Sequence, residues 1–530
     1  MNRYFNTEGI CEPRLHYMVN LEDRLEKIKR LLVDRGKYFT ITRGRQYGKT
    51  TTLQALKHYL ETDYLVLFTD FQMLSSTSFK EEASFSKAFA EILEKAFQTT
   101  GTKYFKSCPI QEKSVSALSD CTSLRTLFKQ ISYICKILPV PVVLMIDEAD
   151  SASDNQIFTD FLSMLREYYL DRENSPTFHS VILAGVYDIK NLKLKLRPEA
   201  NHHYNSPWNI AAKFNIEMNF SANQIAGMLL EYESDHHTQM NVQMIADEIY
   251  SYTSGYPYFV SAVCKILDEE LPEINAFPNE HSVWSHQGIA YAINFLLKED
   301  ISLFGNMAKQ LDSYEDLRKM IECILYEGRK IAFSPLDRSV SLGTMFGFLK
   351  NENGYTVVAN RIFEMALLTM FSTKESVNSD TWHYGQREKN QFLSNGRLNM
   401  DLILQKFTEH FTDIYGDNDE KFIEKYGRKF FLLYLKPIIN GTGNYYLETQ
   451  TRDAGRTDVI IDYLGCQYIV EMKIWHGNEY NKRGELQLLE YLNYFHLQKG
   501  YLLSFNFNKS KETGIKTIRL NDRIIIEAVV

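Results

Sequence analysis

The chain of 530 residues is too long for one ordinary hydrophobic core, so its length predicts two to four domains. Its formal net charge of −8 argues against a nucleic-acid-binding coat along the whole chain, although a local basic groove is compatible with it. The seven cysteines are scattered and form no C-x-x-C pair, which predicts a cytoplasmic protein without disulfides or structural zinc. No run approaches the roughly 20 apolar residues of a membrane span, so no membrane segment is expected.

Between residue 37 and about residue 190, short β-branched runs alternate with longer amphipathic runs. Four of the short runs are strongly apolar, and they cover residues 37–42, 64–70, 139–150 and 178–186. Strands that are apolar on both faces and separated by helices are typical of a parallel sheet covered on both sides. We therefore predict an α/β core over residues 1–215.

Helical signals follow this core. Ser221 with Gln224 forms a capping box, and Gly255 with Pro257 marks the end of one helix and the start of the next. These signals predict a small helical domain over residues 216–298.

The rest of the chain divides into three parts. In residues 299–372, helices flank a hairpin signal, SLGTMFGFLKNENGYTVVA, which is typical of a winged-helix-like module. Residues 373–396 are polar and without periodicity, which predicts a linker. Helices, then strands, then a helix and a strand over residues 397–530 predict a second α/β domain.

The stretch RGRQYGKTT joins the first expected strand to a helix. It ends like the phosphate-binding loop G-x-x-x-x-G-K-[ST], although Arg43 stands where the first glycine belongs and Gly44 comes one place late. The helix N-terminus would face phosphates, Lys49 would neutralise them, and Thr50 would offer its hydroxyl to Mg²⁺. The residues that we expect around ATP are Arg43, Gly44, Arg45, Gln46, Tyr47, Gly48, Lys49, Thr50 and Thr51.

A second motif supports a nucleotide site. The run VVLMIDEAD contains Asp147, which would hold Mg²⁺ through water, and Glu148, which would polarise the attacking water. A solvated strand end is the plainer explanation, but a phosphate loop upstream in its proper strand–helix context argues against it. Arg43 and Arg45 fit two roles equally well, either adding charge near phosphates or pairing with surface acids.

The C-terminal segment RTDVIIDYLGCQYIVEMKIW carries another constellation. Two strands joined by a tight turn at residues 464–466 would put Asp458 and Glu471 opposite each other. Lys473 would then point to the same face as Glu471. Two carboxylates can hold one or two Mg²⁺ ions, with Mn²⁺ as an alternative, and a lysine can orient or deprotonate a water molecule. A cross-strand salt bridge on a solvated face is the plainer interpretation.

A helix and a further strand follow, which gives a β-β-α-β order. Gln487 and Tyr491 lie at i and i+4 in that helix, so both are expected on one face. Tyr491 as an ordinary core aromatic is the competing interpretation.

Together, RGRQYGKTT, LMIDEAD, KLRPEANHHYNSPWNIAAKFNIEMNFS and SGYPYFVS resemble the bacterial AAA-ATPase-like proteins, relatives of the AAA+ and STAND-type ATPases that usually carry a C-terminal PD-(D/E)XK nuclease domain. The likeness extends through LYEG, LGTMFGFLKNENG and NRIFEM in the middle of the chain. It implies a P-loop parallel-sheet ATPase core with a helical lid before the winged-helix-like module, and a restriction-endonuclease-like α/β domain after the linker.

The resemblance also implies roles for particular segments. Residues 255–257 match the G-x-P element of the lid, which lies near the nucleotide, and strand 178–186 takes the sensor-1 position. The strand's tip, the Tyr-Asp pair at 187–188, lacks the usual Asn or Thr, which argues against efficient hydrolysis. Arg197 can reach a γ-phosphate here or in a neighbouring subunit, and an ordinary surface position suits it equally.

In the C-terminal domain, Gln487 and Tyr491 match the Q-x-x-x-Y element of RecB-like PD-(D/E)XK nucleases, whose side chains sit beside the metal. Asp458 follows a threonine in place of the usual proline. The family's further metal-binding acid lies on the preceding helix, where Glu424 is our candidate and Glu420 the reserve.

The sequence thus predicts an ATP-binding protein that hydrolyses ATP and cuts phosphodiester bonds, with DNA as the expected nucleic acid, through a Mg²⁺-dependent nuclease domain. The altered loop and strand tip favour an alternative, a nucleotide-gated regulator that binds nucleic acid with little cleavage. A third interpretation is an ATPase whose C-terminal domain only binds. A homo-oligomer is compatible with each of these functions.

Overall fold

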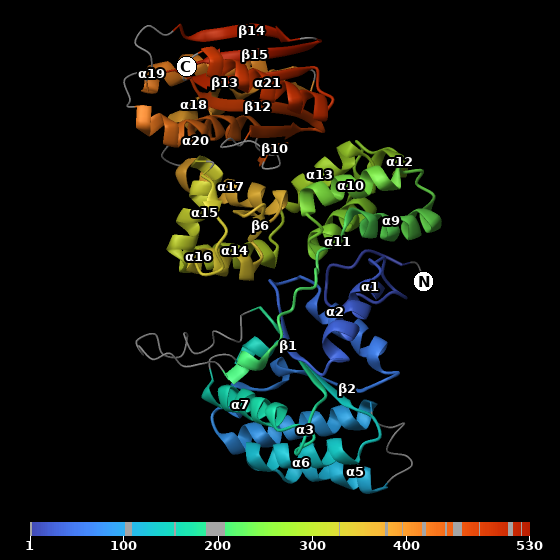
Figure 1. Ribbon diagram of the computed structural model, residues 1–530. Coiled ribbons are helices and arrows are strands. Elements are labelled where there is room, and N and C mark those ends of the chain that lie inside the picture. The colour runs from blue at the N-terminus through green and yellow to red at the C-terminus, as the bar shows by residue number, and fades with distance from the viewer. Residues whose placement is uncertain are drawn as a thin grey trace. The chain divides into compact units, whose positions relative to one another are not determined.

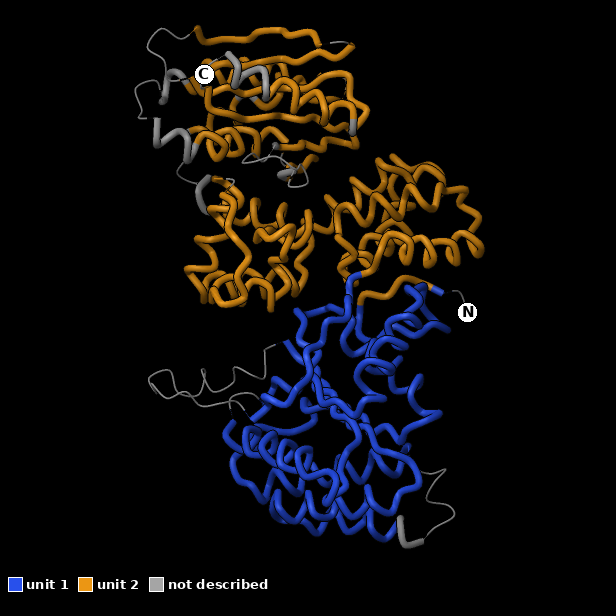
Figure 2. Tube along the Cα trace, viewed as in Figure 1, with its two compact units in different colours: residues 1–3, 8–219 blue, residues 4–7, 220–530 orange. Residues whose placement is uncertain are grey.

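The computed structural model divides into two compact units, residues 1–3 with 8–219 and residues 4–7 with 220–530 (Figure 2). It describes residues 3–100, 109–152, 155–186, 207–327, 329–376, 380–394, 396–415, 420–439, 442–448, 458–475, 478–506, 512–520 and 522–530. Among the helices of these residues, none is both long and apolar enough to cross a bilayer.

The first unit is built on a four-stranded parallel sheet in the order β1-β4-β3-β2. Its two edge strands, β1 and β2, are labelled in Figure 1. Its strands are β1 (Tyr38–Thr42), β2 (Leu65–Asp70), β3 (Val142–Asp147) and β4 (Ser180–Gly185). The helices around it are α1 (Glu22–Ile28), α2 (Lys49–Leu60), α3 (Glu82–Thr100), α5 (Pro109–Ser116), α6 (Leu124–Ile137) and α7 (Gln156–Leu170). Each strand lies within one of the four apolar runs of the sequence, so the predicted parallel sheet is confirmed.

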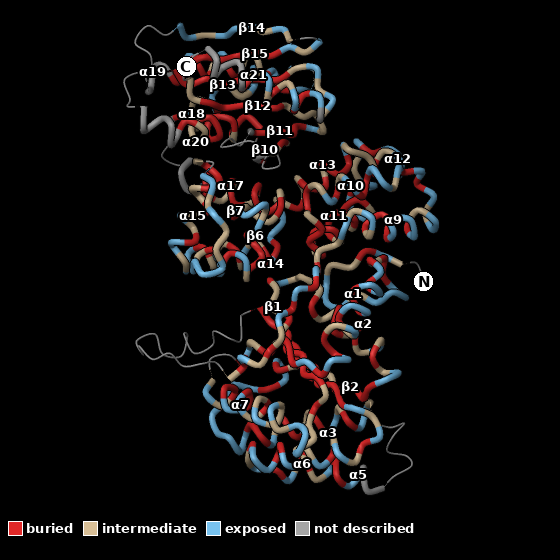
Figure 3. The backbone as a smooth tube through the Cα atoms, viewed as in Figure 1, coloured by how far each residue is buried: buried red, intermediate tan, exposed pale blue. Residues whose placement is uncertain are grey.

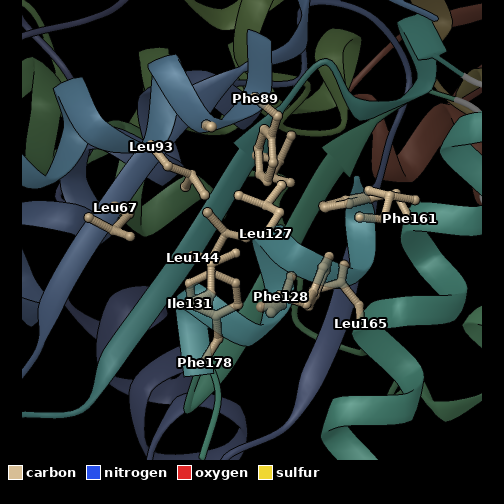
Figure 4. Close-up of a cluster of buried hydrophobic side chains, with 14 of the residues drawn as sticks. Leu67, Phe89, Leu93, Leu127, Phe128, Ile131, Leu144, Phe161, Leu165 and Phe178 are labelled. Atoms are coloured by element: carbon tan, nitrogen blue, oxygen red, sulfur yellow. The ribbon is translucent and has the colours of Figure 1, made fainter. Parts of the chain in front are cut away.

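The two faces of this sheet are buried because its strands are apolar on both sides (Figure 3). Alternate residues such as Leu67 and Leu144 face a core to which α3, α6 and α7 contribute (Figure 4). Phe161 on α7 packs edge-on against Phe89 on α3, with ring centroids 5.0 Å apart. Fully burying one such side chain contributes about 1.5–3 kcal/mol. This core therefore holds in place the strand ends that carry the first site.

The second unit begins with helices α9 (Ala222–His236), α10 (Val242–Thr253), α11 (Pro257–Lys265), α12 (Glu280–Val283) and α13 (His286–Leu296). The capping box predicted before α9 is confirmed, since Gln224 N donates to Ser221 Oγ at 3.2 Å and Ser221 N donates to Gln224 Oε1 at 3.0 Å. Gly255 has φ +72°, and a Cβ there would overlap the carbonyl oxygen of Phe220. Only glycine fits this turn between α10 and α11.

The middle of the second unit contains a three-stranded antiparallel sheet in the order β5-β7-β6. In chain order its elements are α14 (Ser302–Ser313), α15 (Glu315–Glu327), β5 (Ile331–Ala332), α16 (Arg338–Phe346), β6 (Leu349–Glu352), β7 (Tyr355–Val358) and α17 (Arg361–Ser376). The expected hairpin is β6–β7 alone, because the SLGTMF part of the segment forms the end of α16. A winged-helix identity for this module stays a prediction.

The segment 373–396, expected as a linker, contains regular structure. Helix α17 continues into it, and α18 (Asp380–Glu388) follows and packs against α20 (Glu420–Ile439). Gly385 permits this close approach, because a Cβ there would overlap the carbonyl oxygen of Tyr434. Contact with a distant helix gives the segment its structure, and local periodicity does not report such contact.

The C-terminal part of the second unit is a six-stranded mixed sheet in the order β10-β11-β12-β13-β15-β14. Its strands are β10 (Gly443–Glu448), β11 (Asp458–Tyr463), β12 (Cys466–Ile474), β13 (Lys499–Phe505), β14 (Gly514–Leu520) and β15 (Arg523–Val529). Strand β11 is antiparallel to β10 and β12, whereas β13 is parallel to β12 and β15. A short pair, β8 (Leu393–Ser394) and β9 (Arg397–Leu398), precedes the sheet.

Helices cover both faces of this sheet. Helix α21 (Asn478–Tyr494) packs on one face, where Leu492 lies against Gly500 of β13. Helices α19 (Met400–Tyr415) and α20 pack on the other, where the ring of Phe411 lies 5.5 Å from that of Phe505. This arrangement confirms the expected α/β organisation of the C-terminal region, while its identity as a nuclease domain stays a prediction.

Two polar contacts join the first helices of the second unit to this sheet. The hydroxyl of Tyr252 on α10 donates to Asp462 Oδ2 on β11 at 2.9 Å, and both side chains are buried. Asn444 Nδ2 on β10 donates to Asn294 Oδ1 on α13 at 2.7 Å. Burial raises the pKa of Asp462, so its hydrogen bond from Tyr252 compensates part of the cost of a buried carboxylate.

Candidate nucleotide and metal sites

The phosphate loop joins β1 to α2 at the carboxyl end of the parallel sheet. Gly48, the residue before α2, has φ +70°, and Gln46 has φ +56°, so the loop passes twice through the left-handed region. Glycine adopts this conformation without strain, which explains the glycine directly before the helix. The first N–H groups of a helix have no acceptor within the helix, so the start of α2 can bind phosphate oxygens.

Lys49, the first residue of α2, is buried. Its Nζ donates to the carbonyl oxygens of Gly44 at 2.9 Å and Arg43 at 3.2 Å, so the side chain folds back over its own loop. Burial lowers the pKa of Lys49, while the carboxylates of Glu148 and Asp150 act in the opposite direction. The ammonium lies where phosphate oxygens can replace the two carbonyl acceptors.

Thr50 connects the loop to β3. Its Oγ1 donates to Oδ2 of the buried Asp147 at 2.6 Å, and Asp147 Oδ1 accepts a second hydrogen bond from Glu148 N at 3.0 Å. Burial raises the pKa of Asp147, and these two bonds oppose that effect. A hydroxyl and a carboxylate side by side form the kind of oxygen donor set that suits Mg²⁺.

Glu148 and Asp150 follow the end of β3. Burial, followed by the charge of Asp150, raises the pKa of Glu148 above that of an ordinary glutamate. Asp150 Oδ2 accepts from Val186 N at 3.0 Å, and its carboxylate fills the space beside Gly185, where a Cβ would clash with it. Asp150 therefore ties the acidic segment to the end of β4. Sequence reasoning missed this role, although a second acid two residues after Glu148 was a signal for it.

Arg43, which stands in place of the loop's first glycine, has backbone and aromatic partners, and both roles proposed for it stay predictions. Its guanidinium donates to the carbonyl oxygens of Thr42 at 2.9 Å and Ile216 at 3.4 Å, and it lies 5.6 Å from the centre of the Phe214 ring. The side chain therefore ties the loop to the chain segment after the sheet. Arg45 is exposed, and its two proposed roles stay open.

The hairpin expected at the C-terminal acids is formed by β11 and β12. Val459 pairs with Val470, and the same register sets Asp458, the first residue of β11, opposite Glu471. The turn at residues 464–465 has φ +52° and +75°, as a two-residue type I′ turn requires. Register alone therefore brings the two predicted metal-binding positions together.

The predicted face of β12 is buried beneath α21. Glu471 is 0% exposed and Lys473 is 4% exposed. Lys473 Nζ occupies the space beside Gly484 of α21, because a Cβ on that glycine would clash with it. Further along α21, Gln487 Nε2 donates to the hydroxyl of the buried Tyr491 at 3.4 Å. Gly484, Gln487 and Tyr491 are spaced i, i+3 and i+7, so one face of α21 carries all three.

Several expected residues lie outside the described part of the chain, namely residues 187–188 and Arg197. The side chains of Asp458, Glu420 and Glu424 also lie outside it, although their backbones belong to β11 and α20. Among the residues that are described, no group of three or more His, Cys, Asp and Glu side chains forms a metal cluster. The two-acid metal site therefore stays a prediction.

A model of the AAA-like domain family matches residues 14–280, just over half of the chain. The chain belongs to the AAA-like domain family. This match covers the phosphate loop, the acids after β3 and the turn at Gly255, and it ends before the C-terminal sheet. The AAA-like protein is thus a nucleotide-binding protein of the P-loop ATPase-like kind. The family match does not cover its C-terminal domain and therefore does not classify that domain.

No curated protein matches the AAA-like protein. Among solved structures it is similar to a Walker-type ATPase of Pyrococcus abyssi, with 12% identity and a TM-score of 0.45 over 68% of this chain and 99% of that one. It is also similar to the ORC2 protein of Aeropyrum pernix in ADPNP–ADP complexes (12% identity, TM-score 0.34, 67% and 92% covered). The ORC1 protein of that organism in complex with DNA matches at 11% identity and a TM-score of 0.29, with 68% and 94% covered. Similarity this distant carries no argument about function.

Proposed function

We propose that this AAA-like protein binds and hydrolyses ATP and that its C-terminal domain is a metal-dependent nuclease acting on DNA. The observation that carries the first part is the 2.6 Å hydrogen bond from Thr50 Oγ1 to Asp147 Oδ2. It joins the hydroxyl of the phosphate loop to the acid that ends β3, which is the pairing that a Mg²⁺–ATP site needs.

In the proposed reaction, water adds to the γ-phosphorus and the bond to the β-phosphate oxygen breaks. The N–H groups at the start of α2 bind phosphate oxygens, and the ammonium of Lys49 exchanges its carbonyl acceptors for them. Thr50 and Asp147 would hold Mg²⁺, which when bound supplies charge that stabilises the transferred phosphoryl group. Glu148 in its ionised form orients the attacking water and accepts its proton.

The nuclease part rests on the register of β11 and β12. This register supports a site in which Asp458 and Glu471 lie opposite each other on neighbouring strands, with Lys473 on the same face of the sheet. The position of Lys473 against α21, the helix that carries Gln487 and Tyr491, agrees with the same site. DNA is the expected substrate because the resemblance joins AAA-ATPase-like cores to PD-(D/E)XK nucleases.

In the proposed cleavage, water adds to the phosphorus of a phosphodiester and the bond from phosphorus to one sugar oxygen breaks. Asp458 and Glu471 would hold Mg²⁺ or Mn²⁺, which when bound polarises the phosphate and acidifies water. Lys473 orients that water or stabilises the charge that develops on the phosphate oxygens. The attacking water loses a proton to solvent, and the departing sugar oxygen takes one from solvent.

The test is cleavage of DNA and RNA substrates with Mg²⁺ or Mn²⁺, with and without ATP, by the wild type, Lys49→Ala and Glu471→Ala. ATP binding and hydrolysis are measured on the same samples. We expect Glu471→Ala to stop cleavage and to bind ATP like the wild type, and Lys49→Ala to lose ATP binding. A wild type that binds no ATP would overturn the first part, and one that binds ATP but cuts no substrate would overturn the second.

A second candidate function is a nucleotide-gated regulator that binds nucleic acid with little cleavage. The burial of Glu471 and Lys473 favours it, because a phosphodiester does not reach fully covered side chains in this conformation. Binding of labelled DNA with and without ATP separates the two functions, since a regulator binds in an ATP-dependent way and leaves the DNA intact. Sedimentation of the same samples tests whether the protein forms a homo-oligomer.

A further inference from the structure

The last strand of the C-terminal sheet carries a buried carboxylate that belongs to no motif. Glu527 on β15 is 3% exposed, and its Oε1 accepts a hydrogen bond from Ser504 Oγ on β13 at 2.7 Å. Ser504 is itself 0% exposed. Moving a carboxylate out of water is unfavourable unless the interior supplies compensating interactions. A glutamate inside the apolar run IIIEAVV is therefore unexpected for a purely structural strand.

The register places this pair next to the proposed nuclease residues. Strand β13 lies between β12 and β15, with Ser504 beside Lys473 and with Leu502 between Glu471 and Glu527. Directly paired positions of neighbouring strands share a face of the sheet, so these polar side chains all lie on the face that α21 covers. Neighbouring strands are about 4.8 Å apart. Ser504 is therefore the group that links Glu527 to the strand that carries Lys473.

Glu527 has a polar neighbour on each side of its strand. Strand β14 sets the exposed Lys516 opposite Glu527 on the outer side. The carboxylate nevertheless accepts from the fully buried Ser504 on the inner side. A hydroxyl that donates to a carboxylate keeps its lone pairs available on its other side, where an ammonium can donate to them.

We propose that Glu527 is a positioning residue of the nuclease site, which acts through Ser504 to hold Lys473 in its working geometry. This inference rests on the proposed nuclease function. Glu527 fixes the hydroxyl of Ser504 in one orientation, and its negative charge stabilises the neighbouring ammonium within the covered face. Lys473 is not a proposed metal ligand, so a residue that orients it should change the turnover rate and leave the binding of substrate and metal unchanged.

The test compares Glu527→Gln, Ser504→Ala, the double variant and Lys516→Ala in the full chain. Glu527→Gln keeps the shape and an acceptor oxygen but removes the charge, while Ser504→Ala removes only the hydroxyl. We expect each single change to lower kcat for DNA cleavage by about 10–100-fold, the usual range for residues that orient a metal site. KM and the affinity for Mn²⁺, measured by electron paramagnetic resonance, should stay at wild-type values. Lys516→Ala should behave like the wild type.

Because the two residues act as one unit, the double variant should be no slower than the slower single variant. Wild-type kcat in a folded Glu527→Gln protein would overturn the proposal, as would weaker Mn²⁺ binding, which would make Glu527 a ligand. If Glu527→Gln fails to fold, Ser504→Ala alone decides, and an unchanged kcat there overturns the proposal. A wild type that cuts nothing removes the nuclease function itself. Cleavage that depends on Glu471 but not on Glu527 removes only the positioning role.

Discussion

The phosphate loop and the C-terminal hairpin place their acids in different ways. Asp147 is the last residue of a parallel strand, and Glu148 follows it, partly exposed, at the edge where α2 begins. Glu471 lies inside β12 and is fully buried beneath α21. Glu148, just after the strand end, can meet a ligand directly, whereas an acid within a covered strand depends on the packing above it. The first site therefore lies where strands end beside a loop, whereas the second lies beneath a covering helix.

The largest expected effect is the loss of ATP hydrolysis in Glu148→Gln, which removes the group that accepts the proton of water. General-base catalysis contributes about 10²–10⁴-fold, so hydrolysis should fall by that factor while ATP binding stays near the wild-type value. The exposed Glu91 on α3 provides the matched control as Glu91→Gln. If Glu148→Gln hydrolyses ATP at the wild-type rate, the first site does not work through its strand-end acid.

The C-terminal site should instead be sensitive to packing. Gly484→Ala places a methyl group where Lys473 Nζ lies, so cleavage should fall by about 10–100-fold, as for other changes that misplace a site residue. Gly305→Ala on α14 meets open space and should stabilise the protein by about 0.5–1 kcal/mol without changing cleavage. Equal cleavage by both variants would mean that the space beside Gly484 does not position the lysine. Urea unfolding separates loss of activity from loss of fold.

A smaller effect is expected on the pH dependence of ATP hydrolysis. Burial and the charge of Asp150 raise the pKa of Glu148, so hydrolysis should be lost on the acid side at a higher pH than for an ordinary glutamate. Asp150→Asn removes the neighbouring charge and keeps an acceptor oxygen for Val186 N. The pKa of Glu148 should then fall, and the acid limb of the pH–rate profile should move to lower pH. An acid limb that stays in place or moves upward would contradict this cause.

The smallest expected change comes from restoring the first glycine of the loop. Arg43→Gly removes the contacts with Ile216 and Phe214 and adds backbone freedom, so the free energy of unfolding should fall by about 1–2 kcal/mol. ATP affinity should change by only a few-fold, because Gly48 and Lys49 form the end of the loop that binds phosphate. Arg45→Gly, which replaces an exposed arginine of the same loop, is the control and should destabilise the protein less. Tenfold weaker ATP binding in Arg43→Gly alone would show that Arg43 contacts the nucleotide.

The features that sequence reasoning predicts well are those with a local signal. Apolar runs such as VVLMID form strands because every side chain in them can be buried on one face or the other. Ser221 and Gln224 satisfy each other's backbone N–H groups within one helical turn. The register of β11 and β12 follows from a two-residue turn, so counting residues from that turn was enough to pair Asp458 with Glu471.

The features that it missed depend on partners far away in the chain. Asp150 gains its role from Val186, which follows another strand. Helix α18 is held by its close approach to α20, where Gly385 lies beside the carbonyl oxygen of Tyr434. Glu527 and Ser504 meet only because β13 and β15 are neighbours, although a lone acid in an apolar strand was a usable warning. The succession of helices and strands along the chain can be inferred from local sequence patterns. The partners of a side chain can be inferred only when the order of the strands in the sheet is known.

The bond from Tyr252 to Asp462 has a practical consequence for dissecting the protein. A chain shortened to end before residue 397 would keep Tyr252 and Asn294 but lose the acceptor and the donor that β11 and β10 provide for them. An interior polar group deprived of its partner costs about 1–3 kcal/mol, and the apolar surface around it would be opened to water as well. Lower ATPase activity in such a fragment would report damage to its own helices and not a signal lost from the missing domain. Point variants in the full chain are therefore the sounder way to ask whether the two sites communicate.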